Sequence, residues 1–258
     1  MPIGAIIIGD EIMRGKRADK HMAQLISILR GRGLTLAWCQ YLGDDPALIT
    51  STLQRTLAGQ DIVFSFGGIG ATPDDHTREC AAAAAGVDLV LHPEAEAEIR
   101  GRFGGDTTAN RLKMGEFPRG SNIIPNSYNR ICGFSFREHH FVPGFPIMAW
   151  PMVEWVLDTR YAHLFHLQPE TESSIVVYDS AESILTPLME AVEARYRGLK
   201  VFSLPSVGEG GRRRHIELGV RGAPEEVPAA MEELKRGVTE TGASWEAHAV
   251  PPAPAAGS

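Results

Sequence analysis

The residues best suited to chemistry lie between Gly67 and Thr77, in the sequence Gly-Gly-Ile-Gly-Ala-Thr-Pro-Asp-Asp-His-Thr, which we call the glycine loop. The loop follows residues 62–66, a short apolar run typical of a strand buried on both faces. Glycines let the backbone approach a ligand, or adopt positive φ, without a Cβ clash. We expect a helix to begin here, with Thr72 as its N-cap and Pro73 in its first position. The free N–H groups and the dipole of such a helix start favour an anion such as phosphate.

Two acids in the glycine loop, Asp74 and Asp75, complicate this interpretation. Carboxylates beside a phosphate repel it unless a cation lies between them, and Mg²⁺ typically binds one or two carboxylates together with phosphate oxygens and water. We therefore expect either a Mg²⁺-like ion or contacts from one aspartate to hydroxyl or amino groups of the ligand. The alternative is that both acids only stabilise the helix start. The glycine spacing matches neither the dinucleotide-binding fingerprint nor a P-loop.

Three predicted strands would position this loop and bring further acids to it. The strands are residues 3–8, 34–41 and 62–66. The first ends in Gly9-Asp10-Glu11 and the second in Gly43-Asp44-Asp45, with helices expected over residues 19–30 and from Pro46. Alternating strands and helices predict a largely parallel sheet with helices on both faces. Because such sheets bind ligands at the carboxyl ends of their strands, the three loops would meet there.

The remaining chain divides into two parts. Up to about residue 165 we expect short strands and helices that end in a helix over residues 148–157. Beyond a boundary near residues 168–170 the expected order of elements changes to βαββαβ, the ferredoxin-like plan. The sequence therefore predicts a domain of residues 1–168, a small α+β domain of residues 171–248 and a disordered tail of residues 249–258.

Composition limits the class of protein. The chain of 258 residues carries a net charge of −7, which argues against general nucleic-acid binding. The three cysteines, Cys39, Cys80 and Cys132, form no Cys-x-x-Cys pair, so we expect neither a disulfide framework nor a zinc site, and a cytoplasmic location fits. No apolar run approaches the roughly 20 residues that span a membrane, and the start of the chain lacks a signal-peptide pattern.

The glycine loop resembles the signature of the MoaB/Mog molybdopterin-binding family, and more closely its branch in competence/damage-inducible protein A (CinA), where Gly-Gly-x-Gly-x-Thr-Pro-Asp-Asp-x-Thr is typical. Other family motifs follow in the same order to about residue 165. They are Gly9-Asp10-Glu11, Asp19, Gly43-Asp44-Asp45, Pro118-Arg-Gly120-Ser121, Asn126-Ser-Tyr-Asn129 and Pro143-Gly-Phe-Pro146. The resemblance implies a three-layer αβα sandwich, followed by the small domain. We expect the deamidase domain that often completes CinA to be absent, because the chain ends before it.

The resemblance also implies a ligand, which is a phosphorylated pterin (molybdopterin) or a related nucleotide. The expected binding residues are Gly9, Asp10, Glu11, Asp44, Gly67, Gly68, Gly70, Thr72, Asp75 and Thr77. Glycine N–H groups would bind the phosphate, and the acids would bind the heterocycle or an ion.

Two alternatives stay open. CinA-type domains are similar to metal-dependent pyrophosphatases that cleave ADP-ribose or similar dinucleotides. In that case Asp75 and Asp74 would be catalytic, and Asp75 with Asp10 would hold Mg²⁺ or Co²⁺. Family members also assemble as dimers or trimers, so the third hypothesis is an oligomeric interaction protein with a vestigial site.

Three departures from the family pattern affect the opposite wall of the expected crevice. Family members usually carry Asn at the position of His21. Related CinA proteins usually carry Gly-Thr-Ala-Pro-Gly at residues 129–133 and Glu at the position of Met148. A methionine can neither ligate Mg²⁺ nor accept a proton, which counts against the hypothesis that this protein is a pyrophosphatase.

Two further clusters are weaker candidates. Arg212-Arg213-Arg214 is more typical of a solvated turn than of a phosphate site. His139-His140 lacks a third metal ligand at recognisable spacing.

Overall fold

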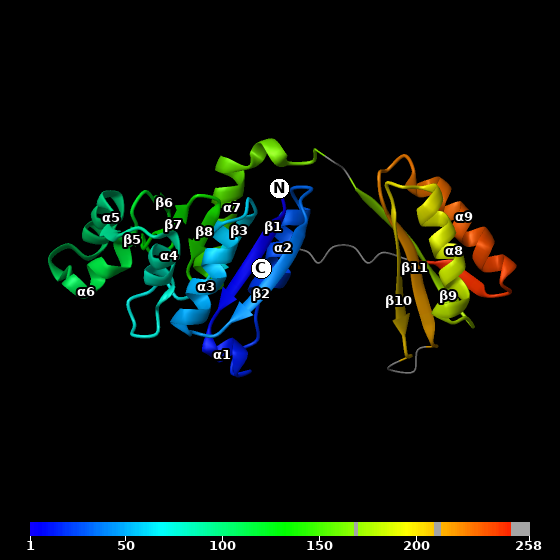
Figure 1. Ribbon diagram of the computed structural model, residues 1–258, viewed down its shortest axis with the longest axis horizontal. Helices are drawn as coiled ribbons and strands as arrows, with labels where there is room; N and C mark the ends of the chain where they lie inside the picture. Colours follow the sequence, from blue (N-terminus) through cyan, green and yellow to red (C-terminus); the bar gives the residue numbers. More distant parts are fainter. Residues whose placement is uncertain (168–169, 209–212, 249–258) are drawn as a thin grey trace. The chain divides into compact units, whose positions relative to one another are not determined.

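The computed structural model describes residues 1–167, 170–208 and 213–248 (Figure 1). The chain forms two compact units, an N-terminal unit of residues 1–165 and a C-terminal unit of residues 166–258. The tail and Arg212, for which the sequence makes predictions, lie outside the described residues.

A six-stranded sheet forms the middle layer of the N-terminal unit, in the order β2-β1-β3-β8-β7-β6. Its strands are β1 (Ile3–Ile8), β2 (Leu36–Leu42), β3 (Ile62–Phe66), β6 (Asn122–Ile124), β7 (Gly133–Phe136) and β8 (His139–Val142). Strands β2, β1, β3 and β8 are parallel, whereas β7 and β6 are antiparallel to their neighbours. The carboxyl ends of β1, β2 and β3 therefore lie together, as the sequence predicts.

Helices cover both faces of this sheet because successive side chains of β1 alternate between two apolar cores. Ile3, Ala5 and Ile7 pack with α2 (His21–Arg30) and α7 (Pro146–Arg160). Ile6 and Ile8 pack with α3 (Pro46–Leu57) and α4 (Thr77–Ala85). The predicted three-layer αβα sandwich is confirmed.

Local signals fix the helix starts. Asp45 accepts a hydrogen bond from the N–H of Leu48 (2.8 Å), so it caps α3 with Pro46 in the first turn. Asp19 accepts from the N–H groups of His21 and Met22, and α2 begins at His21 rather than at residue 19.

Smaller elements complete the N-terminal unit. β4 (Leu89–Leu91) and β5 (Glu116–Pro118) form a separate antiparallel pair. The short helical segments are α1 (Asp10–Met13), α5 (Pro93–Phe103), α6 (Ala109–Leu112) and the 3₁₀ turns η1 (Gly104–Asp106), η2 (Lys113–Gly115) and η3 (Ala162–Leu164). The closing helix α7 is longer than predicted and contains Pro151.

The C-terminal unit is a four-stranded antiparallel sheet in the order β10-β11-β9-β12 with two helices, which is the ferredoxin-like order. Its elements are β9 (Thr171–Tyr178), α8 (Glu182–Arg195), β10 (Lys200–Ser206), β11 (His215–Gly222), α9 (Val227–Glu240) and β12 (Ser244–Ala247). Apolar residues of β9 and β11 form one core with both helices.

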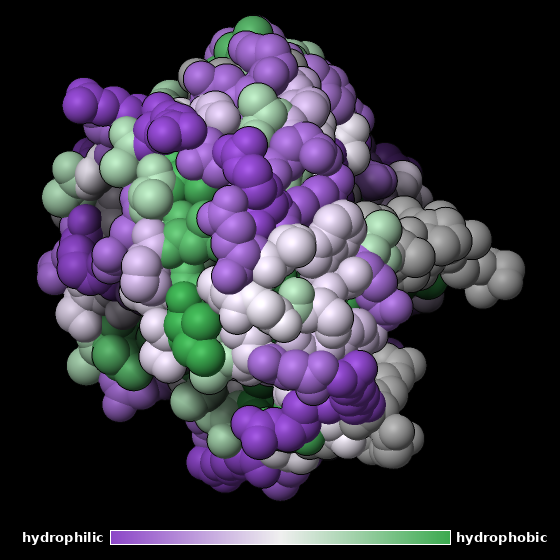
Figure 2. Space-filling view, turned by 90° about the vertical axis from the view of Figure 1, so that its right-hand side faces the viewer, coloured by the Kyte–Doolittle hydropathy of each residue, from purple (hydrophilic) through white to green (hydrophobic). Residues whose placement is uncertain are grey.

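Figure 2 shows one face of the molecule, on which hydrophilic residues predominate around a narrow vertical band of hydrophobic ones. Among the helices that the structure describes, none combines the length and the apolar character needed to cross a bilayer.

Candidate functional site

The acid-bearing loops after β1 and β2 bind each other through two hydrogen bonds. The N–H of Asp10 donates to Asp44 Oδ2 (2.9 Å), and the N–H of Asp44 donates to Asp10 Oδ1 (3.2 Å). A Cβ at Gly43 would lie 2.7 Å from Asp10 Oδ1, so this pairing requires a glycine there. Arg14, which directly follows α1, forms an ion pair with Asp10.

The same contacts concentrate negative charge. Partial burial raises the pKa of the Asp44 carboxyl above its ordinary value, and the carboxylates of Asp10, Glu11 and Asp74 add to this rise. The structure therefore brings these four acids together, as expected from their positions after parallel strands.

The start of the helix after the glycine loop differs from the prediction. α4 begins at Thr77, not near Thr72, and His76 is its N-cap. Asp75 Oδ2 accepts from the N–H of Thr72 (2.8 Å) and from the Thr72 hydroxyl, while the N–H of Asp75 donates to the carbonyl of Thr72. This mutual bonding closes residues 72–75 into a turn, so the prediction that Thr72 caps the helix is wrong.

Thr77 and Arg78 hold three carbonyls of the glycine loop. The Thr77 hydroxyl donates to the carbonyl of Gly67 (3.1 Å), and the Thr77 N–H donates to that of Gly68 (2.9 Å). Arg78 Nη2 donates to the carbonyl of Gly70 (2.7 Å).

These bonds also decide where the N–H groups of the loop point. The peptides between described residues are trans, and the C=O and N–H of a trans peptide point in opposite directions. The N–H groups of Gly68, Ile69 and Ala71 therefore face away from Thr77 and Arg78, and none donates to a backbone carbonyl of the described residues. We call these three groups the N–H cradle. Successive N–H groups that point to one side form an anion-binding concavity.

The glycines are required by the packing of the loop itself. Gly67 and Gly68 adopt positive φ of 99° and 68°, one of the two roles that the sequence predicts for the loop glycines, whereas Gly70 does not. A Cβ at Gly67 would lie against the carbonyl oxygen of Ile8, and a Cβ at Gly68 would lie against Thr77 Oγ1. Both contacts would be shorter than 3.0 Å, which is closer than Cβ atoms approach other heavy atoms in real proteins. A Cβ at Gly70 would collide with Asp75 Oδ2.

His21, the first departure from the family pattern, lies buried beside the glycine loop. Its Nε2 is 3.1 Å from the carbonyl oxygen of Gly144, and its ring stacks on Phe66 with centroids 4.5 Å apart. Burial lowers the pKa of His21, so the ring is neutral at neutral pH. It joins the start of α2 to the turn at Pro143–Pro146, whose Gly144 approaches Gly67.

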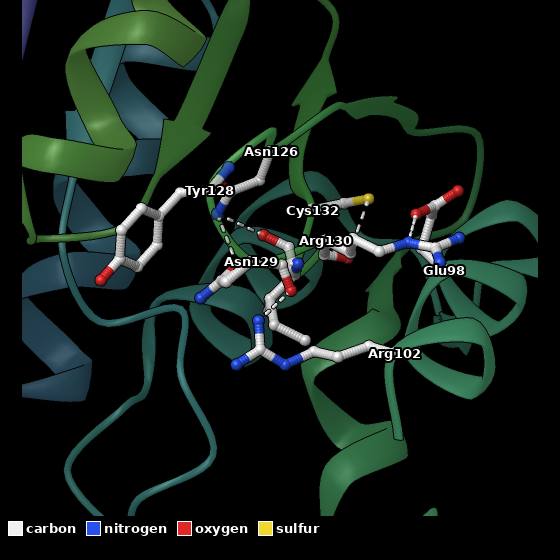
Figure 3. A network of polar contacts seen from close by, with 8 residues as sticks. Glu98, Arg102, Asn126, Tyr128, Asn129, Arg130 and Cys132 are labelled. Atoms are coloured by element: carbon white, nitrogen blue, oxygen red, sulfur yellow. Dashed lines mark hydrogen bonds and ion pairs between the residues drawn. The ribbon is translucent and has the colours of Figure 1, made fainter. Parts of the chain in front are cut away.

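The other two departures contact each other, which the sequence does not reveal. Asn129 Nδ2 lies 3.1 Å from Met148 Sδ, while Asn129 Oδ1 accepts from Asn126 Nδ2 and from the N–H of Ile131 (both 2.9 Å). Figure 3 shows the part of this network around Asn126 and Asn129, in which Arg102 also donates to the carbonyl of Asn129.

A cavity of about 370 Å³ opens beside this network. Its lining includes Asn126, Arg130, Glu98, Cys132 and Trp155, with the Arg130 guanidinium 2.6 Å from Glu98 Oε2. No residue of the glycine loop lines it.

The paired histidines belong to the core. His139 Nε2 is 2.9 Å from Thr56 Oγ1, and His140 lies between Ser135 Oγ (2.8 Å) and Tyr161 Oη (2.7 Å). Across the described ranges, no group of three or more His, Cys, Asp or Glu side chains is placed to hold a metal ion.

Sequence reasoning missed Arg78. It is only 2% exposed although it carries a charge. The available signal was a single arginine that opens an alanine-rich helix, where acids are the favoured residues.

We expect Thr77→Val to destabilise the N-terminal unit because it removes the hydroxyl that holds the carbonyl of Gly67. Thr77→Ser keeps the hydroxyl and is the matched control. The loss of a buried hydrogen bond that leaves a carbonyl unpaired costs about 1–3 kcal/mol of unfolding free energy. Urea unfolding of the two variants measures this difference, and equal stabilities would contradict the assigned role of the hydroxyl.

Comparisons with known proteins agree with this architecture. A family described as "Probable molybdopterin binding domain" matches residues 4–163. A CinA-like protein of Anaeromyxobacter sp. (strain Fw109-5) is 30% identical over 262 residues, which cover 90% of this chain and 64% of that protein. A CinA-like protein of Anaeromyxobacter sp. (strain K) is 33% identical over 165 residues, covering 61% of this chain and 40% of that protein. The chain thus spans 40% to 64% of the length of these two relatives.

Among solved structures, the crystal structure of CinA from Thermoplasma acidophilum, a protein of unknown function, aligns with a TM-score of 0.56 and 26% identity. The alignment covers 61% of this chain and 98% of that one. Since the matched family covers more than half of the sequence, this chain belongs to the molybdopterin-binding domain family, and CinA-like proteins are among its relatives.

Proposed function

We propose that the three loops after β1, β2 and β3 bind a phosphorylated pterin, such as molybdopterin, or a related nucleotide. The observation that carries the proposal is the N–H cradle, whose three donors are turned away from Thr77 and Arg78 by the bonds that these two residues make. Backbone N–H groups beside a helix start are a common phosphate-binding arrangement. Membership of the molybdopterin-binding family supports a pterin as the heterocycle.

The acids beside the cradle complement the other end of such a ligand. A pterin ring presents amino and ring N–H donors, and ionised carboxylates accept hydrogen bonds from such donors more strongly than neutral groups do. Asp10, Glu11 and Asp44 supply these acceptors, and their mutual repulsion, which contributes to the raised pKa of Asp44, is relieved when donors arrive. The phosphate would lie at the cradle and the heterocycle at the acid-bearing loops.

Mg²⁺ is compatible with these residues, with Asp10 and Asp75 as the proposed ligands. Mg²⁺ needs only one or two carboxylates when phosphate oxygens and water complete its shell. Asp10 and Asp75 are already engaged by Arg14 and Thr72, so an ion would share them with these partners. When bound, the ion would neutralise charge on the phosphate.

We expect Asp75→Asn to lower affinity for a phosphorylated pterin by about tenfold, a change of about 1.4 kcal/mol. The Asp75 carboxylate accepts from both the N–H and the hydroxyl of Thr72, and an amide oxygen makes weaker bonds in their place. Titration of neopterin monophosphate, followed by pterin fluorescence, measures the affinity.

The exposed Asp106 of η1 supplies the control, because Asp106→Asn changes the net charge equally. Identical binding curves for wild type and Asp75→Asn would remove Asp75 from the site. Failure of the wild type to bind either neopterin monophosphate or a nucleotide such as GMP would reject the proposed function.

The second candidate is a metal-dependent pyrophosphatase, which the adjacent Asp10 and Asp44 carboxylates favour. Incubation with ADP-ribose and Mg²⁺ or Co²⁺ tests it. AMP release that disappears in Asp75→Asn would replace the binding proposal with this enzyme, whereas no AMP release supports binding alone.

A further inference from the structure

The Arg78 guanidinium is a buried charge that pairs with no buried carboxylate of the residues the structure describes. It is 2% exposed, and its Nη groups donate to the carbonyls of Gly70 and Lys113, which are neutral. Its nearest paired carboxylate, on Glu79, is 3.8 Å away and half exposed to solvent. Its Nε is buried and has no hydrogen-bond partner among the described atoms.

This arrangement is costly for the free protein. Moving an ion out of water costs several kcal/mol in real proteins unless close opposite charge offsets it. Carbonyl dipoles offset part of that cost, and the solvated Glu79 offsets little because water screens it. A net positive charge therefore lies beneath the glycine loop in a region of low dielectric, where its field is weakly screened.

The field of Arg78 acts on the N–H cradle directly. The guanidinium donates to the carbonyl of Gly70, and the same peptide carries the N–H of Ala71 on its opposite side. A carbonyl that accepts a charged hydrogen bond polarises its peptide and makes the N–H a stronger donor. The guanidinium therefore adds positive potential at residues 68–71, which the Asp75 carboxylate beside Gly70 opposes in part. Asp10, Glu11 and Asp44 form the negative end of the site.

We propose that Arg78 is the counter-charge for the phosphate end of the ligand and gives the glycine loop its preference for phosphorylated over unphosphorylated molecules. Arg78 is a positioning residue that acts through the peptide of Gly70 without touching the ligand. The inference rests on the proposed function only in assigning phosphate to this loop.

Three small molecules separate the contribution of the phosphate charge to binding from that of the heterocycle. Inorganic pyrophosphate tests the anion alone, and neopterin with and without its monophosphate gives the contribution of the phosphate within one scaffold. Isothermal titration of the full chain is compared for wild type, Arg78→Gln and Arg78→Lys. Gln keeps a donor for the carbonyl of Gly70 but removes the charge, whereas Lys keeps the charge. Arg55→Met is the control, because the exposed Arg55 bonds only to Gln40 among the described side chains.

Wild type and Arg55→Met are expected to bind pyrophosphate, and to prefer the phosphorylated neopterin by at least about tenfold. Arg78→Gln should lose pyrophosphate binding and this preference while keeping the affinity for unphosphorylated neopterin. Arg78→Lys should keep the preference to within about threefold because the ammonium carries the same unit charge, although it cannot reproduce the planar fork of the guanidinium. A merely structural role would instead lower both neopterin affinities equally.

Each other outcome has a defined meaning. Preserved pyrophosphate binding in folded Arg78→Gln overturns the inference, as does a wild type that does not bind pyrophosphate. Binding of pyrophosphate but of neither neopterin leaves the role of Arg78 intact and rejects the pterin. Thermal unfolding verifies the fold of each variant. If only Arg78→Lys folds, its preference decides: a retained preference supports the counter-charge and a lost one overturns it.

Discussion

Gly68→Ala is expected to lower the free energy of unfolding of the N-terminal unit by about 3 kcal/mol and to abolish phosphate binding. Gly68 adopts φ of 68°, where an alanine costs about 1–2 kcal/mol. A Cβ would also collide with Thr77 Oγ1, which is buried and bonded to the carbonyl of Gly67. Displacing that hydroxyl breaks a buried hydrogen bond, which lowers the free energy of unfolding by a further amount of about 1–3 kcal/mol.

The same displacement disturbs the N–H cradle. The Thr77 hydroxyl orients the peptide that carries the carbonyl of Gly67 and the N–H of Gly68. Once that bond is lost, the N–H is no longer held pointing away from Thr77, so the phosphate loses a donor. The effect on binding therefore shares its cause with the effect on stability.

Gly86 provides a matched control for Gly68→Ala. It ends α4 with the same φ of 68°, and a Cβ there would meet nothing within 4 Å. Gly86→Ala thus costs only the conformational strain of about 1–2 kcal/mol. Urea unfolding is followed by tryptophan fluorescence in a Trp245→Phe background. The other tryptophans all lie in the N-terminal unit, so the signal measures the unfolding of that unit alone. Equal losses for the two alanine variants would refute the packing argument.

Acidification is expected to destabilise the N-terminal unit by about 3 kcal/mol through His139 alone. Burial lowers the pKa of His139 from 6.5 to about 4, and the nearby Arg137 adds to the shift while Asp61 opposes it. His140 shifts in the same direction, also chiefly because of burial. Both rings are therefore neutral in the folded protein at neutral pH.

The sign of the effect follows from proton binding. Between pH 6.5 and about 4 the unfolded chain binds a proton at residue 139 that the folded protein does not. The stabilising contribution is complete above pH 6.5, declines as the pH falls through this window and is exhausted below about 4.

Urea unfolding of wild type and His139→Gln at several pH values between 7.5 and 4 measures this contribution. Glutamine can still bond to Thr56, and the two proteins share every other titrating group, so the difference between their curves isolates His139. We expect wild type to lose stability more steeply than the variant. Parallel pH profiles would show that His139 is protonated as readily in the folded protein as in the unfolded chain.

Several features of this protein are determined by the sequence itself. The alternation of apolar runs and helical periodicity gives the order of strands and helices, because side-chain period follows directly from backbone geometry. The acids at positions 10, 11 and 44 meet because parallel strands end at one side of a sheet. The glycine loop identifies the family, and its residue type permits the positive φ that Gly67 and Gly68 adopt.

Other features depend on contacts between distant parts of the chain. Asp75 accepts from the N–H of Thr72 as in a capping box, yet α4 begins only at Thr77, which residue preferences at a helix start do not reveal. Asn129 and Met148, departures that lie 19 residues apart in the sequence, contact each other. The charge of Arg78 is buried because α4 packs between the glycine loop and the carbonyl of Lys113, 35 residues away. Burial and pairing of polar groups depend on which segments the fold brings together, and only the tertiary structure decides that.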